Sequence, residues 1–225
     1  MSSKKNQKGT LDESLNSSET FFIKNRKAIL GGIGAVVVII IAAILYHSYV
    51  SLPREDEAST ELSKSEQLMM QQQYEAALKG FQKVAEDYSG TDAGNLANLY
   101  TGLCYAHQAK PNWAKAKEAV EKFDTKSDAI ISPESQVALG DIYANNNELD
   151  KAVASFKKAA DMANSKATDG VNLSVAPIAL LKAGQILENQ GKKAEALEIY
   201  QNIKKTYVAS PIYQEVDKYI ERASR

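Results

Sequence analysis

The chain has 225 residues, a formal net charge of −1 and 24% charged residues, so its overall charge gives no reason to expect a nucleic-acid partner. Its one cysteine, Cys104, excludes an intrachain disulfide framework. The two histidines, His47 and His107, are too few to complete a zinc cluster with that cysteine, and we therefore predict no metal site.

An uncharged apolar run follows a polar N-terminal tail. The tail, residues 1–27, has a low apolar content that predicts disorder up to about Ser18. The run AILGGIGAVVVIIIAAILY then extends from Ala28 to Tyr46. As a helix, these 19 residues rise about 28 Å, close to the roughly 30 Å hydrocarbon core of a bilayer. Because the run has no polar stripe, we predict a transmembrane helix at residues 28–50.

A cleaved signal peptide is the alternative interpretation of this run. Signal peptides have an apolar region of about 7–15 residues after a short basic start. Here the run is longer and 27 residues precede it, so an uncleaved signal anchor fits better. Lys24, Arg26 and Lys27 adjoin the run on its N-terminal side, whereas the far side has only Arg54 beside three acids. The positive-inside rule then predicts a cytoplasmic N-terminus and a translocated C-terminal part.

The remaining chain is predicted to be a short linker and one helical domain. Residues 51–56, around Pro53, are expected to form the linker. Residues 57–225 have a helical pattern almost throughout and no segment that alternates as a strand does, so the predicted fold class is all-α. The tail is expected to enter a final helix at Ser210 and Pro211 and to cap the domain with one apolar and one polar face.

Small residues recur in this domain at regular positions. The clearest copy is LGDIYANNNELDKAVASFKKAA, with Gly140 and Tyr143 on a first helix and Ala152, Phe156 and Ala159 on a second. A glycine inside a helix costs about 1 kcal/mol relative to alanine, so its recurrence indicates a steric reason. We predict that each small residue leaves room for a bulky side chain on the paired helix.

The other copies match this one to different degrees. Gly102 and Gly184 take the place of Gly140 in the second and fourth copies. The second copy needs about two extra residues in its turn, and the first copy has no glycine in its first helix, near residues 61–72. The glycines are 38 and 44 residues apart, and the largest insertion is Met162 to Ala176.

This pattern resembles the tetratricopeptide repeat, which places Leu-Gly-x-x-Tyr on a first helix and Ala-x-x-x-Phe-x-x-Ala on a second. The resemblance implies a solenoid of about four helical pairs with a capping helix, although the spacing exceeds the usual 34 or so residues. A pair cannot bury its apolar face alone, so neighbouring pairs stack into one core.

No catalytic constellation is present in the sequence. It lacks a Gly-x-Ser-x-Gly elbow, a P-loop, a His-Glu-x-x-His motif and a dinucleotide-binding glycine motif, so we predict neither an enzyme nor a cofactor. We interpret Cys104 as a small buried residue rather than a reactive thiol. His107 is interpreted as a surface or packing residue that could also contact a ligand.

Binding is expected on the concave face of the solenoid, which first helices line in proteins with this repeat. Such a groove can hold an extended or helical peptide. The candidates are first-helix residues that the repeat itself does not need: Leu99, Leu103, His107, Val137, Asp141, Asn145, Leu181, Gln185 and Asn189.

The whole layout resembles the YfgM-type ancillary subunit of the bacterial Sec translocon. The stretch SETFFIKNRKAILGG, Ser18 to Gly32, is similar to the juxtamembrane segment of that family, with Phe21 and Phe22 where many relatives have tryptophans. The resemblance implies a non-enzymatic protein of the bacterial inner membrane, with a periplasmic repeat domain. It would lie near the translocon and serve periplasmic chaperones or emerging chains.

Three other functions stay open at this point. One is a scaffold for envelope assembly or cell division, with different partners. Another is a eukaryotic organelle import receptor with its repeats in the cytosol. An enzyme is the last, and it would need a catalytic cluster that only folding could assemble. The sequence does not give the oligomeric state.

Overall fold

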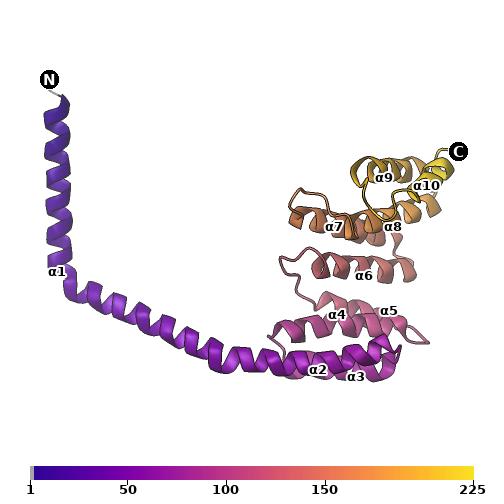
Figure 1. Cartoon of the computed structure of the whole chain (residues 1–225), viewed down its shortest axis with the longest axis horizontal. Coiled ribbons are helices and arrows are strands. Elements are labelled where there is room, and N and C mark those ends of the chain that lie inside the picture. The colour runs from indigo at the N-terminus through magenta and orange to yellow at the C-terminus, as the bar shows by residue number, and fades with distance from the viewer. Residues whose placement is uncertain (1–2) are drawn as a thin grey trace. The chain divides into compact units, whose positions relative to one another are not determined.

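The structure is a computed structural model that describes residues 3–225, with the side chains of Phe21 and residues 23–225. Every element in this part of the chain is helical, which confirms the all-α fold class (Figure 1). The chain divides into a unit that ends at Arg54 and a compact unit, Glu55–Arg225. In order, the elements are α1 (Ser3–Tyr46), η1 (His47–Ser51), α2 (Leu52–Met70), α3 (Tyr74–Asp87), α4 (Asp92–His107), α5 (Trp113–Glu121), α6 (Ile131–Asn145), α7 (Leu149–Lys166), α8 (Val175–Asn189), α9 (Lys193–Thr206) and α10 (Val216–Ala223).

Helix α1 contains most of the polar tail and residues 28–46 of the predicted span, and the last four residues of the span, 47–50, lie in η1. The structure gives α1 as helical from Ser3, and the disorder expected up to about Ser18 stays a prediction. In the described part of the chain, one helix is long and apolar enough to cross a membrane, and none of its most apolar window is buried against protein.

The expected linker at residues 51–56 is helical as well. The π-helix η1 leads directly into α2, and the Leu52 N–H donates to the carbonyl of His47. Pro53 follows as the second residue of α2. A proline has no N–H and crowds the preceding turn, and a widened π turn is one way for a helix to accommodate it.

Helices α2 to α9 form four antiparallel pairs that stack in chain order, and α10 packs on α9 (Figure 1). The Glu55 carboxylate ties the start of α2 to the second pair. It accepts hydrogen bonds from the backbone N–H groups of Asp92 and Ala93, at 2.7 and 2.8 Å. These N–H groups open α4, where a helix has unsatisfied donors and a partial positive charge.

The glycines of the repeat lie against large side chains, as predicted. A Cβ on Gly140 would lie 2.5–2.8 Å from three ring atoms of Phe156, which is closer than real Cβ atoms approach. Gly184 faces the Tyr200 ring in the same way, and Gly102 faces Val120. The two extra residues in the turn of the second copy therefore restore the same pairing.

In the first pair the small residue is on the other helix. Ser65 of α2 takes the place of the repeat glycine and is buried. The glycine that gives it room is Gly80 of α3, whose Cβ would overlap the Ser65 hydroxyl. Phe81, the next residue, is fully buried and corresponds to Phe156. The first copy thus keeps the close approach of its two helices, but its glycine lies on the second helix instead of the first.

The capping helix begins later than expected. Residues 211–215 form turns, and α10 starts at Val216 rather than at Pro211. The Lys204 ammonium on α9 donates to the carbonyl of Tyr213, which holds this turn close to α9 before the helix begins. The predicted apolar face is present: Val216 and Tyr219 are buried in the core, and the structure adds Ala223 to them.

Hydrogen bonds of the Asn172 side chain hold the long insertion against the start of α8. Asn172 accepts through its side-chain oxygen from the N–H groups of Val175 and Ser174, at 2.7 and 3.1 Å, and its amide donates to the carbonyl of Ala129. We expect Asn172→Ala to lower the free energy of unfolding by about 1–2 kcal/mol, as the loss of a helix cap does. Urea unfolding followed by circular dichroism measures this, and Asn189→Ala, an exposed change on the same helix, is expected to have little effect.

Candidate functional site

A mostly apolar hollow lies between the first helices α4 and α6, with a volume of about 260 Å³. We call it the α4–α6 groove. Four of the nine predicted groove residues line it: Leu99, Leu103, Val137 and Asp141. The structure adds Leu96, Tyr100, Ile130, Ile131, Glu134 and Ala138.

Helical periodicity places both walls of the groove. Leu96, Leu99 and Leu103 of α4 are spaced i, i+3 and i+7, which puts them on one face of the helix. Glu134 and Asp141 of α6 have the same seven-residue spacing. Leu99 and Val137 are largely buried between the helices, so they form the floor of the groove.

Two neighbouring isoleucines stand exposed at the start of α6. Ile130 is 60% exposed and Ile131 is 41% exposed, although both line an apolar hollow. Single exposed apolar residues are common on protein surfaces, but an apolar patch that continues into a hollow is typical of an interaction site. In the sequence, these two isoleucines come directly before a Ser-Pro dipeptide. That dipeptide was the signal that could have pointed to them.

Carboxylates border the groove. Asp141 accepts two hydrogen bonds from the ammonium of Lys182 on α8, at 2.6 and 2.7 Å. Burial raises the pKa of Glu134; Lys182 lowers it and the Asp141 charge raises it further. Burial raises the pKa of Tyr100 to about 12, helped by Glu66 of α2. The groove therefore combines apolar walls with acidic side chains.

The other predicted groove residues lie elsewhere. Leu181 is buried in the core, and Gln185 donates to the Tyr219 hydroxyl at 2.9 Å, which links α8 to the capping helix α10. The ring of His107 stacks on Tyr74, with centroids 5.5 Å apart, and that residue joins the first two pairs. Asn145 and Asn189 are exposed near the ends of their helices. The structure does not bring these five residues into the α4–α6 groove.

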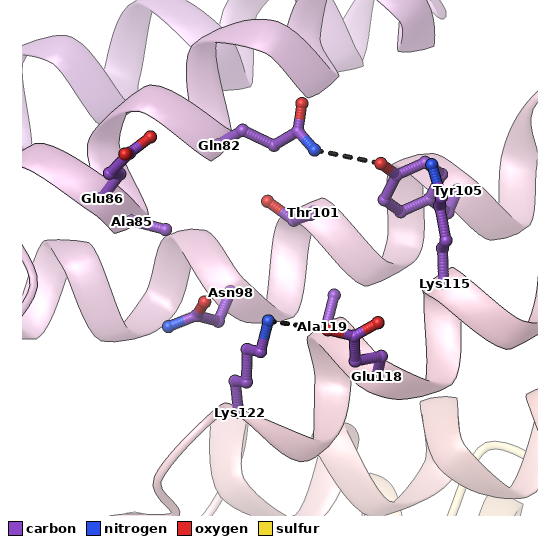
Figure 2. A pocket seen from close by; sticks show the side chains of 10 residues that line it. All are labelled: Gln82, Ala85, Glu86, Asn98, Thr101, Tyr105, Lys115, Glu118, Ala119 and Lys122. Atoms are coloured by element: carbon purple, nitrogen blue, oxygen red, sulfur yellow. Dashed lines mark hydrogen bonds and ion pairs between the residues drawn. The ribbon is translucent and has the colours of Figure 1, made fainter.

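A second hollow, of about 440 Å³, lies between α3, α4 and α5 (Figure 2). Its polar side chains mostly contact one another. Gln82 donates to the Tyr105 hydroxyl at 2.9 Å, and Lys122 donates to Glu118 at 2.9 Å. Because these polar groups already form hydrogen bonds with each other, this hollow is a weaker candidate for binding a partner than the α4–α6 groove.

The Thr101 hydroxyl lies in this second hollow without a hydrogen-bond partner in the structure (Figure 2). Its residue is only 7% exposed. A buried hydroxyl that makes no hydrogen bond is destabilising, so Thr101→Val is expected to raise the free energy of unfolding by about 1 kcal/mol. Thr60→Val is the control, because the Thr60 hydroxyl is exposed and bonded to the Asp56 carbonyl. If both substitutions change the free energy of urea unfolding equally, the missing hydrogen-bond partner of Thr101 is not the cause.

The groups that could support chemistry do not gather in the described residues. No cluster of three or more His, Cys, Asp or Glu side chains occurs there with the geometry to hold a metal ion. Cys104 is buried, and burial raises its pKa to about 11, so it is a thiol at neutral pH, as the sequence predicted.

The tetratricopeptide repeat-like domain family matches residues 19–216. The chain belongs to this family. Domains with this repeat generally bind proteins and are not typically catalytic.

Two solved structures from Podosopora anserina, assigned as nearly identical tetratricopeptide-like repeats of a kinesin light chain, resemble the chain. The first is 13% identical, covers 75% of this chain and 86% of its own, and has a TM-score of 0.58. A single-substitution variant of it is 14% identical, covers 75% and 85%, and has the same TM-score. At these identities the likeness shows the fold alone. No curated protein matches the sequence.

Proposed function

We propose that this protein is a non-enzymatic, membrane-anchored scaffold that binds proteins or peptides in the α4–α6 groove. The observation that carries the proposal is the apolar hollow with Ile130 and Ile131 exposed at its edge. Burying such side chains on a partner is favourable, since each releases apolar surface from water. Membership of a repeat family that generally binds proteins supports the same conclusion.

The proposed location is the bacterial inner membrane, with a cytoplasmic N-terminus and a periplasmic repeat domain. The long apolar helix supports an anchor. The basic residues Lys24, Arg26 and Lys27 on its N-terminal side support this orientation. Protease treatment of spheroplasts tests the topology: the repeat domain should be digested, and its protection would instead place it in the cytoplasm.

The proposed partners are subunits of the Sec translocon and periplasmic chaperones. The support is the layout of a short basic tail, one span and a repeat domain, together with the segment Ser18 to Gly32. A scaffold for envelope assembly or cell division has the same layout but different partners, and therefore predicts a different set of captured proteins.

Crosslinking in intact membranes, followed by affinity capture of the full chain, tests the partners. We expect a translocon subunit among the captured proteins, and Ile131→Asp should reduce its yield. The substitution is safe for folding because the residue is exposed at the first position of α6, where an acid suits the helix. Val208→Asp, at another exposed apolar residue, is the matched control. Absence of every translocon subunit would reject this partner.

A further inference from the structure

We infer that the α4–α6 groove selects a peptide segment in which a large apolar side chain is followed closely by lysine or arginine. The inference rests on the proposed function and specifies the chemistry of the partner. It follows from the apolar walls of the groove and from the charges that surround it.

The apolar side chain would occupy the hollow itself. Leucines of α4 form one wall, and Val137 and Ala138 of α6 form part of the other. The hollow of about 260 Å³ is smaller than a typical drug-sized ligand pocket, so it suits one side chain rather than a whole small molecule. Ile130 and Ile131 extend the apolar surface to the outside, where the flanking part of the peptide would lie.

The preference for a basic side chain in the peptide follows from the charges at the groove. Glu134 and Asp141 of α6 line the groove and supply two carboxylates, and Glu66 of α2 hydrogen-bonds to Tyr100, another lining residue. Among the described residues, the cation that pairs with these carboxylates is Lys182 of α8, which is already bound to Asp141. Tyr100 of α4 is neutral at physiological pH. The excess of negative charge favours a cationic partner and disfavours an acidic one.

Glu134 is the carboxylate best placed to receive the cation. In the described part of the chain no group donates a hydrogen bond to it, whereas Asp141 already has Lys182. It lies one turn from Ile131 and one turn from Val137 on α6, beside the apolar hollow. A lysine or arginine near the anchoring side chain would reach it.

Fluorescence anisotropy with the full chain in detergent micelles tests the inference. The probes are three fluorescein-labelled peptides: GSLLRGSG, GSLLEGSG, and GSAARGSG. We expect the first to bind about fivefold more tightly than the second, as an exposed charge contact allows. The third should bind least. High salt should reduce the difference between the first two, because exposed charges are screened.

Variants assign the preference to the groove. Glu134→Gln should remove the difference between the arginine and glutamate peptides, whereas Glu195→Gln, an exposed change on α9, should leave it unchanged. Ile131→Asp should weaken both leucine peptides. Preference for arginine that survives Glu134→Gln would overturn the inference.

The remaining outcomes separate the inference from the proposed function. Equal binding of the two leucine peptides, abolished by Ile131→Asp, would overturn the charge preference and leave peptide binding intact. No binding of either leucine peptide would count against the groove as a peptide site and would overturn both. A dimer that Ile131→Asp converts to a monomer would show that a second copy covers the groove, and would also overturn the inference.

Discussion

Replacing Gly140 with valine is expected to lower the free energy of unfolding of the repeat domain by about 2–3 kcal/mol. The Cβ alone would lie 2.5–2.8 Å from three ring atoms of Phe156, which is itself almost fully buried. Either the ring or the whole of α7 must move, and both α6 and α8 pack against α7. Urea unfolding of the full chain in micelles, followed by circular dichroism, measures the loss.

A double-mutant cycle shows whether the ring is the cause. Phe156→Ala by itself should cost about 3–5 kcal/mol, because it leaves a cavity. In that background, Gly140→Val should cost little, since the added methyls would enter the vacated space. Ala154→Val adds a β-branched side chain at an exposed position of α7 and should cost less than about 1 kcal/mol. Additive costs of the two changes would contradict the steric role of Gly140.

Arginine at both Val37 and Ile40 is expected to release the protein from the membrane. Both residues lie near the middle of the apolar run, and a charge there costs about 2.5–3.5 kcal/mol each on insertion scales. Alkaline carbonate extraction of membranes measures the release: the wild type should stay in the pellet and the variant should appear in the supernatant.

A control pair and a tag distinguish an anchor from a cleaved signal. Arginine at Thr60 and Ser63 has the same spacing but lies beyond the predicted span, at exposed positions of α2, and should leave the protein in the pellet. An N-terminal epitope tag should remain on the mature chain. Loss of the tag from the mature protein would show cleavage and would contradict the anchor.

The pairing of helices could be predicted from the sequence because it depends on local spacing. Gly140 and Phe156 are 16 residues apart, as are Gly184 and Tyr200, and this distance is set by one helix, one turn and the next helix. The exchange of Gly80 and Ser65 in the first pair was missed. The sequence alone does not reveal which of the two helices holds the small residue once the glycine has moved.

The α4–α6 groove was only partly predictable. Leu99, Leu103, Val137 and Asp141 were found because they are first-helix residues that the repeat itself does not need, which were expected to line the concave face. Ile130, Ile131 and Glu134 were not, since their position depends on how the loop after α5 leads into α6. The separation and twist of neighbouring first helices decide which side chains stay exposed, and these arise from packing between residues far apart in the chain.

Where the predicted ends of elements differ from those in the structure, the differences have a common cause. The linker around Pro53 and the late start of α10 both depend on contacts outside the local segment. Glu55, two residues after Pro53, accepts hydrogen bonds from the start of α4, and the turns before Val216 are held by Lys204 on a preceding helix. Propensity and spacing describe what a segment can do locally, whereas such contacts select one outcome.

Site-specific photo-crosslinking in cells tests most directly whether the α4–α6 groove binds proteins. A photoreactive benzoyl-phenylalanine would replace Ile131 at the groove and, in a second variant, Lys157 on the exposed face of α7. We expect defined protein adducts from the groove position, which Glu134→Gln weakens, and few from the α7 position. Adducts that are equal at the two positions, or absent from the groove, would contradict the account.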